Sequence, residues 1–466
     1  LINNTLDPNY EAIYSYFLYG LTPTLLGESW FKRINLFPSS SYISFDLILN
    51  KFTSKTYWQY PTSRNTNYNY DIACQTFTEL ITSSASLRSR SDVGYGVVLS
   101  GGLDSISTFE ILTKVNPNFV PKSYTCNSSF SNSFDNNFIY RRSNPMPDDI
   151  KYSQLYCEER NITQEIITLC NFNEFSNNLY SNIASLGYHH SSPSIPFLVQ
   201  LYKKSKSEQK VMFDGQGADE MLGGYYTRII MPIIIDTLKS NPIKVPKIIS
   251  DYRKAYSIVG SIPNFLNQLN YLKLRDIRNV ILSINKIFKI KYKQTNLSTL
   301  LHAEPEWKTK SFFSKELFFS HKYGLSNLLS YGDSISMING QENRSIFLDH
   351  RLVDFCFKLP RNALIFDGYT KRILRDSLSD VLPNYLLKQR SKNGFTMPFK
   401  SILIEGKSEI VNNILSVIKN NQSLNNFLDY NSVSKLLDRF YAGDDKLTNV
   451  VYKLYGLSIW FELYSN

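Results

Sequence analysis

The sequence predicts an α/β protein in which a parallel sheet with helices on both faces precedes a mostly helical C-terminal part. Between residues 66 and 226, short apolar runs alternate with stretches of helical spacing, which is typical of parallel strands joined by helices. From about Thr227 onward, strand signals nearly vanish and helical spacing continues to the end of the chain. The chain has 466 residues, 42% hydrophobic and 14% aromatic, which is ample for a buried core.

The first 65 residues carry too little apolar periodicity for a domain of their own. A helix is predicted there from the spacing of Tyr10, Ile13, Tyr14 and Phe17. Short extended pieces follow around residues 42–45 and 57–58. The polar stretch 61–70, rich in Thr, Ser, Arg and Asn, predicts a linker to the rest of the chain.

The sheet is predicted from short apolar runs that contain β-branched residues. These runs are residues 95–99, 120–126, 164–169 and 210–213. The helices expected around them are 73–81, 150–160 and 195–203. The last helix of the chain is predicted from Leu447, Val451, Leu454, Leu457 and Phe461.

Composition narrows the class of protein. The net charge of +11 is spread along the chain rather than gathered in a tract, which argues against a nucleic-acid-binding protein. The five cysteines form no C-x-x-C pair and fit reduced thiols in a cytoplasmic protein. The most apolar run, 229–235, contains Pro232 and is too short to span a membrane. Because Leu1 is not a start methionine, we expect a piece of a longer protein.

A glycine-rich turn follows the first predicted strand of the sheet. Residues 100–105 read Ser-Gly-Gly-Leu-Asp-Ser, and two adjacent glycines let several backbone N–H groups turn toward one point at the start of the next helix. This pattern predicts a phosphate cradle, in which Asp104 and the serine hydroxyls would serve a magnesium-bound polyphosphate. The alternative is an ordinary strand-to-helix turn. No lysine follows the second glycine, so the turn is not a conventional P-loop.

Three further motifs carry charge beside glycine or aromatic residues. Residues 213–225 again close a strand with glycines and place Asp219 and Glu220 in the first turn of a helix, where carboxylates can meet magnesium. Residues 342–351 and 390–398 combine charges with aromatic and glycine positions. Taken alone, each of these last two is better explained as a surface ion-pair cluster.

In this order, the four motifs resemble the synthetase domain of glutamine-dependent asparagine synthetases, and residues 100–105 resemble the pyrophosphate loop of N-type ATP pyrophosphatases, the PP-loop superfamily. The likeness extends to Asp-Ser-Ile-Ser-Met at 333–337 and Gly-Tyr-Thr-Lys at 368–371. It covers roughly residues 66–466 and implies an adenine nucleotide alpha-hydrolase-like fold, with a nucleotide-binding core over 66–226 and a helical part over 227–466. Residues 1–65 resemble the tail of the family's N-terminal glutaminase domain and its linker.

The resemblance implies a ligase that uses ATP and Mg²⁺. A carboxylate, with aspartate as the expected substrate, would attack the α-phosphorus of ATP and release pyrophosphate. Ammonia derived from glutamine would then displace AMP and form an amide. The implied partners are therefore a small carboxylate, ammonia and a glutaminase domain or subunit, with neither nucleic acid nor membrane; a homodimer is compatible with the resemblance.

The resemblance also implies roles for individual residues. Those implied to bind ATP or pyrophosphate are Leu99, Ser100, Gly101, Gly102, Asp104, Ser105, Cys126, Asp214 and Gly215. The implied metal ligands are Asp104 and Asp219. The implied catalytic residues are Lys392, Glu342, Gln216, Arg344 and Lys371. Of these, Lys392 would neutralise charge on the α-phosphate, and Glu342 would orient the incoming amine.

Several positions depart from the family pattern. Gln216 stands where well-studied asparagine synthetases have a glutamate, and an amide cannot take a proton at neutral pH. Ser334 replaces an arginine and Ile346 a proline. The N-terminal cysteine nucleophile of the glutaminase domain is missing from this sequence, and Cys74 is no substitute because it lies in a predicted helix.

The sequence leaves three alternatives to an aspartate-specific ligase. One is a relative that joins another carboxylate and amine in polysaccharide or natural-product assembly, as β-lactam synthetases and lasso-peptide cyclases do. Another is a homologue that binds ATP without turnover, for which Gln216 is the argument. The third is a PP-loop enzyme acting on tRNA, against which stand the motifs around Glu342 and Lys392 and the lack of a cysteine pair.

Overall fold

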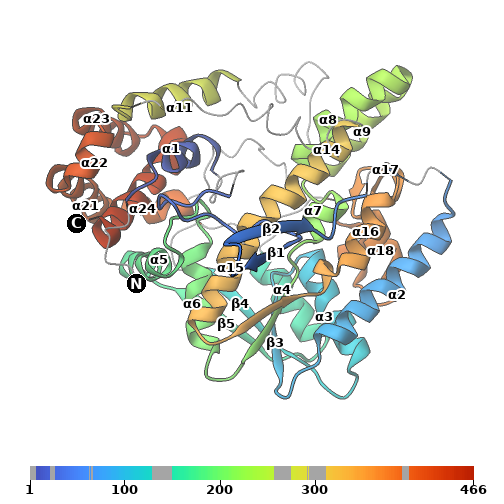
Figure 1. Ribbon diagram of the computed structural model, residues 1–466. Helices are drawn as coiled ribbons and strands as arrows, with labels where there is room; N and C mark the ends of the chain where they lie inside the picture. The colour runs from blue at the N-terminus through green and yellow to red at the C-terminus, as the bar shows by residue number, and fades with distance from the viewer. Residues whose placement is uncertain are drawn as a thin grey trace.

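A computed structural model describes residues 7–20, 27–61, 63–64, 67–128, 149–256, 274–290, 292, 311–390 and 398–465 (Figure 1). Its centre is a five-stranded, entirely parallel sheet with strand order β5-β4-β3-β6-β7. The strands are β3 (Tyr95–Val98), β4 (Lys122–Ser128), β5 (Gln164–Leu169), β6 (Val211–Asp214) and β7 (Glu342–Ser345). This confirms the predicted fold class.

The sheet separates two hydrophobic clusters. On one face Val97 and Leu99 pack with α2 (Tyr70–Arg88), α3 (Leu103–Val115) and α4 (Asp149–Glu159). On the other face Tyr124 and Met212 pack with α5 (Phe172–Leu186), α6 (Ile195–Ser205) and α15 (Ser326–Ile338). Because alternate side chains of a strand point to opposite faces, both faces are covered, as in a three-layer α/β protein.

The fifth strand corrects the prediction that strands nearly vanish after residue 227. Strand β7 comprises Glu-Asn-Arg-Ser and pairs with β6 at the edge of the sheet. Its first residue is exposed and only its last is buried. A short polar edge strand of this kind has no apolar alternation, so hydrophobic periodicity could not detect it.

The remainder of the second half is mainly helical. Its longer helices are α8 (Tyr226–Ser240), α9 (Val245–Tyr256), α11 (Leu274–Ile287), α14 (Phe312–Phe319), α16 (His350–Lys358), α21 (Lys407–Asn420), α23 (Tyr430–Tyr441) and α24 (Thr448–Tyr464). The short ones are α7 (Ala218–Leu222), α17 (Arg361–Leu364), α18 (Arg372–Ser377), α19 (Asn384–Lys388), α20 (Phe399–Glu405) and α22 (Gln422–Phe427). A π-helix covers Ser320–Leu325, and 3₁₀ turns cover Pro242–Lys244, Ile346–Leu348 and Asp445–Leu447. A two-stranded hairpin joins β8 (Ile365–Phe366) and β9 (Tyr369–Thr370).

Residues near the start of the chain pack on its end. Figure 1 shows α1 (Tyr10–Tyr19) among the C-terminal helices α21 to α24. Trp30 lies 5.6 Å from Trp460 between ring centroids, and the Lys453 ammonium donates to the carbonyls of Tyr16 and Phe17 at 3.1 and 3.0 Å. The Tyr16 carbonyl also accepts from the Gly20 N–H at 2.8 Å, so Lys453 adds a second donor to the C-terminal end of α1.

Unlike α1, the antiparallel hairpin of β1 (Ser41–Asp46) and β2 (Lys51–Thr56) is exposed to solvent. Ser41 is half-buried and every other strand residue is exposed. The predicted extended piece at 42–45 lies in β1, whereas residues 57–58 follow β2 outside any strand.

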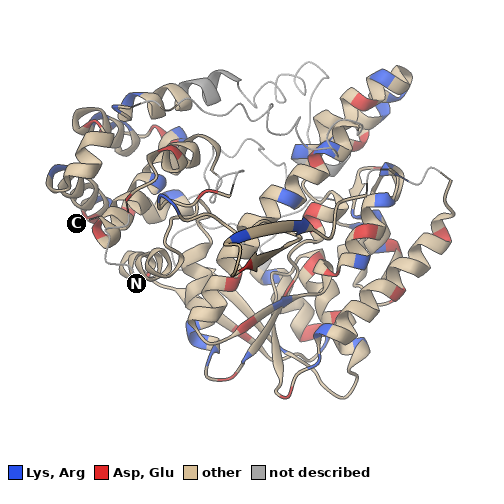
Figure 2. Ribbon diagram, in the orientation of Figure 1, with Lys and Arg blue, Asp and Glu red and all other residues tan. Residues whose placement is uncertain are grey.

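In the described ranges, no helix combines the length and apolarity that crossing a membrane requires. Figure 2 shows basic and acidic residues interspersed over the ribbon, as the dispersed net charge predicts.

Candidate active site

The turn between β3 and α3 forms a braced glycine loop at the carboxyl end of the sheet. Gly101 has φ +71°, a left-handed conformation that favours glycine, and Gly102 is the N-cap of the 13-residue helix α3. The hydroxyl of Ser105 donates to the Gly102 carbonyl at 3.1 Å and accepts from the Ser100 N–H at 3.2 Å. The loop therefore presents the positive end of a helix, which is the arrangement that binds anions.

A second glycine loop, after β6, packs directly on the first. A Cβ atom at Gly215 would lie 2.8 Å from Asp104 Cβ and 3.0 Å from the Ser105 nitrogen, so only glycine fits there. Thr108 Oγ1 donates to the Asp104 carbonyl at 2.9 Å and contacts the Asp214 carbonyl at 3.4 Å. This close approach brings the carboxyl ends of two neighbouring strands together, where ligands bind in open α/β sheets.

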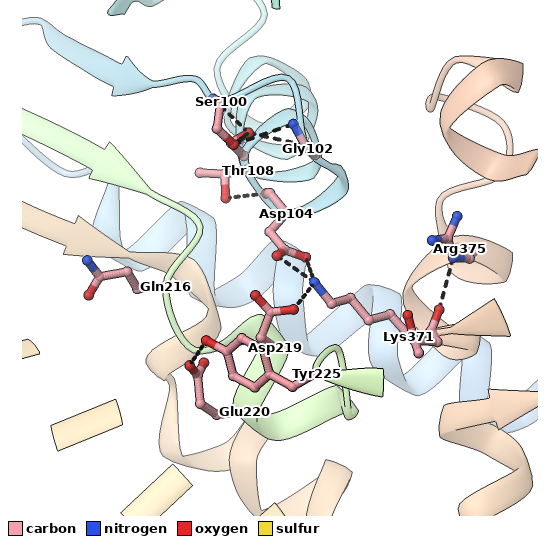
Figure 3. A network of polar contacts seen from close by, with 12 residues as sticks. Ser100, Gly102, Asp104, Thr108, Gln216, Asp219, Glu220, Tyr225, Lys371 and Arg375 are labelled. Carbon is pink, nitrogen blue, oxygen red and sulfur yellow. Dashed lines mark hydrogen bonds and ion pairs between the residues drawn. The ribbon is translucent and has the colours of Figure 1, made fainter. Parts of the chain in front are cut away.

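The two loops and a distant lysine meet in a buried ion cluster (Figure 3). The Lys371 ammonium lies 2.6 and 2.5 Å from the two carboxylate oxygens of Asp104 and 2.6 Å from Asp219 Oδ1. Lys371 is only 3% exposed, and burial lowers the pKa of its ammonium. We call Asp104, Asp219 and Lys371 the acid–lysine cluster, in which two carboxylates contact one ammonium group.

Burial shifts the carboxyl groups around this cluster. Glu220 is buried beside Asp219, and desolvation raises the pKa of its carboxyl, which accepts a 2.6 Å hydrogen bond from the Tyr225 hydroxyl. Burial raises the pKa of Asp214 to about 6, although Asn343 and the Gln216 N–H donate to its oxygens at 2.8 and 3.0 Å. The carboxyl end of the sheet is thus an acidic and poorly hydrated environment.

Gln216 lies in the second glycine loop, and Figure 3 shows its side chain apart from the acid–lysine cluster and pointing away from it. Its backbone carbonyl accepts a 2.6 Å hydrogen bond from the Ser345 hydroxyl, which ties the loop to β7. Its side-chain nitrogen would lie 3.4 Å from a Cβ atom at Gly332 in α15. The structure therefore places the Gln216 amide between the loop, β7 and α15.

Glu342 begins β7 at the amino end of the sheet, and Arg344, which pairs with Phe213 two residues further on, bonds back to it. Glu342 pairs with Val211 at the start of β6, and its carboxylate receives bidentate hydrogen bonds of 3.0 and 2.8 Å from Arg344. Arg344 also donates to the carbonyls of Arg88 and Arg90, at 2.6 and 2.9 Å. The pair fastens β7 to the segment after α2, and the structure does not bring it to the acid–lysine cluster.

Leu99 and Cys126 have buried side chains on opposite faces of the sheet. Leu99 belongs to the cluster with α2 and α3, and Cys126 to the cluster with α6. The Cys126 thiol is 3.4 Å from the Phe197 carbonyl, and burial raises the pKa of this thiol. Each side chain packs within its core cluster, so a contact between Leu99 and a nucleotide would use backbone atoms.

Lys392 lies outside the described residues. Arg390, just before that segment, is held by the β8–β9 hairpin: it donates to Asp367 at 3.2 Å and its guanidinium lies 4.5 Å from the Tyr369 ring centroid. Lys371 directly follows the same hairpin. The hairpin thus joins the lysine of the cluster to the start of the fourth motif.

Three residues that sequence reasoning missed also shape the site. Asn343 fixes the Asp214 carboxylate, Gly224 makes room for Asp219 and Lys371, and Tyr225 donates to Glu220. If residues 342–345 had been predicted as a strand, Asn343 would have been expected on the opposite face of the sheet from Glu342 and Arg344, because alternate residues of a strand face opposite sides. No sequence signal marked Gly224 beyond its position in a glycine pair.

The acid–lysine cluster fits a magnesium–polyphosphate complex. Magnesium is usually held by one or two carboxylates together with phosphate oxygens and water, and here Asp104 and Asp219 converge on one point next to the anion-binding loop. Throughout the described ranges, no group of three or more His, Cys, Asp or Glu side chains could hold a metal ion. The cation would therefore depend on the phosphates for the rest of its coordination.

A parallel sheet with two glycine loops and an acid pair at its carboxyl end defines an α/β protein with a candidate ligand site at that end. More specifically, the chain belongs to the asparagine synthase family, whose sequence model matches residues 76–462. The family match confirms the resemblance of the four motifs to asparagine synthetases.

Individual relatives are distant. Asparagine synthetase [glutamine-hydrolyzing] 1 of Bacillus subtilis is 25% identical over 358 residues, which are 72% of this chain and 51% of that protein. A putative asparagine synthetase [glutamine-hydrolyzing] of Mycobacterium tuberculosis is 23% identical over 408 residues, 86% of this chain and 59% of that protein. The chain thus spans little more than half the length of these relatives.

Proposed function

We propose that this chain is the synthetase part of an asparagine-synthetase-type ligase in the cytoplasm. It would form an acyl-adenylate from a carboxylate and ATP, release pyrophosphate and pass the acyl group to ammonia. Family membership supports an ATP-dependent amide ligase. The same family membership is the basis for proposing aspartate as the carboxylate and a glutaminase domain or subunit as the ammonia source. The proposed division of the chain stays at residues 1–65, 66–226 and 227–466.

One observation carries the proposal: Asp104, Asp219 and Lys371 meet beside the anion-binding loop at the carboxyl end of the sheet. Cleavage between the α- and β-phosphates leaves pyrophosphate, whose charge the loop N–H groups and a lysine can stabilise. Asp104 and Asp219 would hold the magnesium ion, which supplies charge neutralisation at the phosphates when bound. Lys371 would contact phosphate oxygens.

The remaining residues have supporting roles in the proposal. Asp214 and Gly215 would approach the nucleotide through backbone atoms of the second loop. Lys392 would neutralise charge on the α-phosphate. Glu342 and Arg344 are left out of the proposed catalytic set, because their side chains bond to each other and to the end of α2 rather than to the acid–lysine cluster. Gln216 would act by positioning, since an amide cannot serve as a base.

The test is pyrophosphate release from ATP and Mg²⁺ with a panel of carboxylates, aspartate first, with and without ammonium. We expect aspartate to drive release, Lys392→Ala to lower it by about 10²–10³-fold, and asparagine to form only with ammonium. Lys358→Ala is the control, because Lys358 is an exposed residue at the end of α16, outside the site. ATP binding without release for any carboxylate would contradict the ligase proposal.

A second candidate is a relative that joins another carboxylate and amine. The observation that favours it is Gln216, whose amide lies beside Asn343 and Gly332 where asparagine synthetases carry an acid. In the same panel, release that aspartate does not support but another carboxylate does would identify this function. Mass spectrometry of the amide product would then name the amine.

A further inference from the structure

The ammonium of Lys371 occupies the point on which three carboxylate oxygens converge. Both oxygens of Asp104 lie 2.5–2.6 Å from its nitrogen, and Asp219 Oδ1 lies 2.6 Å from it. Divalent cations take oxygen ligands at about 2.0–2.6 Å, so a metal ion held by both carboxylates needs the same position. Lys371 and such a cation cannot contact these oxygens in this way at the same time.

The backbone fixes Lys371 in this place. Its φ of +55° is left-handed, a conformation that lysine rarely adopts. It follows the tight β8–β9 turn, in which Asp367 and Gly368 also have positive φ. Arg375 holds the other side, because its N–H donates to the Lys371 carbonyl at 3.1 Å and its guanidinium to the Thr370 carbonyl at 2.9 Å.

The surrounding chain also leaves room for this ion pair. A Cβ atom at Gly224 would lie 1.8 Å from Asp219 Oδ1 and 2.4 Å from Lys371 Cε, so any side chain there would displace one partner. Lys371 and Asp219 are both largely buried. An ion pair in a fitted, buried position is a fixed part of the site rather than a chance contact between mobile side chains.

The charges explain what the lysine does before a nucleotide binds. Asp104 and Asp219 are adjacent carboxylates in a poorly hydrated place, and a buried charge without a partner is costly. The ammonium gives both a partner. A metal–polyphosphate complex brings its own cation for the carboxylates and phosphate oxygens for the ammonium, so each group has a partner after the exchange.

We propose that Lys371 keeps the acid pair occupied in the absence of nucleotide, excluding free divalent cations, so that the metal ion enters together with the polyphosphate. This inference rests on the proposed function for the identity of the polyphosphate as ATP. In this role Lys371 sets the order in which the metal ion and the polyphosphate bind. Its ammonium passes from the carboxylates to phosphate oxygens when the complex enters.

The experiment measures Mn²⁺ binding to the whole chain without nucleotide, by electron paramagnetic resonance. We expect Lys371→Met to bind Mn²⁺ about tenfold or more tightly than the wild type, because removing a unit positive charge from a metal position changes binding by at least this much. Lys371→Arg keeps the charge and is expected to bind as weakly as the wild type. Equal affinities of the wild type and Lys371→Met would overturn the proposal.

Folding is monitored in parallel, because Lys371→Met leaves two carboxylates facing each other. We expect its melting temperature to rise with Mn²⁺ while that of the nucleotide-free wild type does not. The double variant Asp104→Asn, Lys371→Met removes the repulsion and is expected to fold without metal and to lose the tight Mn²⁺ binding. A Lys371→Met protein that stays unfolded at every Mn²⁺ concentration would contradict the proposal.

These measurements need no turnover, so they separate this inference from the ligase proposal. A chain that releases no pyrophosphate with any carboxylate, yet shows the tenfold Mn²⁺ contrast, supports the role of Lys371 and contradicts the ligase. An active ligase whose wild type and Lys371→Met variant bind Mn²⁺ equally supports the ligase and overturns the role of Lys371.

Discussion

At the carboxyl end of the sheet Lys371 is buried between Asp104 and Asp219, whereas at the amino end Glu342 pairs with Arg344 on an edge strand, its side chain 57% exposed. Both clusters lie in sequence motifs of the family, and both combine acids with a base. Solvent screens the second, so its electrostatic contribution is small. The buried cluster is screened much less and adjoins the anion-binding loop. Position and burial, rather than the presence of charges, distinguish a candidate binding site from an ion pair that connects β7 to the end of α2.

The largest expected effect comes from removing a carboxylate of the buried cluster. Asp104→Ala leaves the buried Lys371 ammonium with Asp219 as its remaining carboxylate contact, and we expect the unfolding free energy to fall by about 3 kcal/mol. Pyrophosphate release is expected to be lost as well. Urea denaturation and the release assay measure the two effects. A variant as stable and active as the wild type would show that the cluster is no more important than the exposed pair.

The glycine next to the cluster tests the packing of the same region. Gly224→Ala places a methyl group against Asp219 and Lys371, and we expect a loss of about 2 kcal/mol in stability, because overpacking forces the ion pair apart. Gly324→Ala is the matched control, because no atom lies within 4 Å of its Cβ position. Thermal unfolding of both variants is the measurement. Equal melting temperatures for the two would contradict the tight fit around the ion pair.

The two ends of the sheet should also differ in pH dependence. Burial raises the pKa of Asp214 to about 6, so the folded protein holds a proton there that the unfolded chain releases near pH 4. Stability from this group is therefore present below pH 4 and lost as pH rises through 6, by on the order of 3 kcal/mol. Arg344 lowers the pKa of Glu342, whose smaller contribution is instead lost as pH falls below its usual range.

Urea denaturation between pH 4 and 7 separates these contributions. Asp214→Asn is expected to remove the decline between pH 4 and 6 that the wild type shows, because an amide does not titrate. The Asn343 amide remains to bond with the new side chain. An identical slope in both proteins would mean that Asp214 is ionised at an ordinary pKa and that its burial has little electrostatic effect.

The smallest effect is expected at the exposed pair. Glu342→Gln removes its charge, and we expect stability to change by less than about 1 kcal/mol and pyrophosphate release to stay within about twofold of the wild type. Arg344 retains its bonds to the carbonyls of Arg88 and Arg90 in this variant. A hundredfold loss of release would return Glu342 to the catalytic set and remove the contrast between the two ends of the sheet.

Much of the fold followed from local patterns. The four apolar runs lie in β3 to β6, and the helices expected at 150–160 and 195–203 lie in α4 and α6 within about a residue or two at each end. Hydrophobic periodicity and glycine turns are short-range signals, which is why they located these elements. The same signals missed β7, because its polar residues form an edge strand through pairing with β6. They also missed the two-residue strands of the β8–β9 hairpin.

The sequence by itself determined the alternation of strands and helices, the two glycine loops and the acidic residues that follow them. The tertiary structure alone decided which charges meet. Lys371 is 267 residues from Asp104 in the chain and contacts it, whereas Glu342 and Arg344 belong to the strand that pairs with β6 and bond to each other instead. The physical reason is that backbone conformation depends on neighbouring residues, while contact between distant charges depends on how helices and strands pack, including a glycine that leaves room for an ion pair.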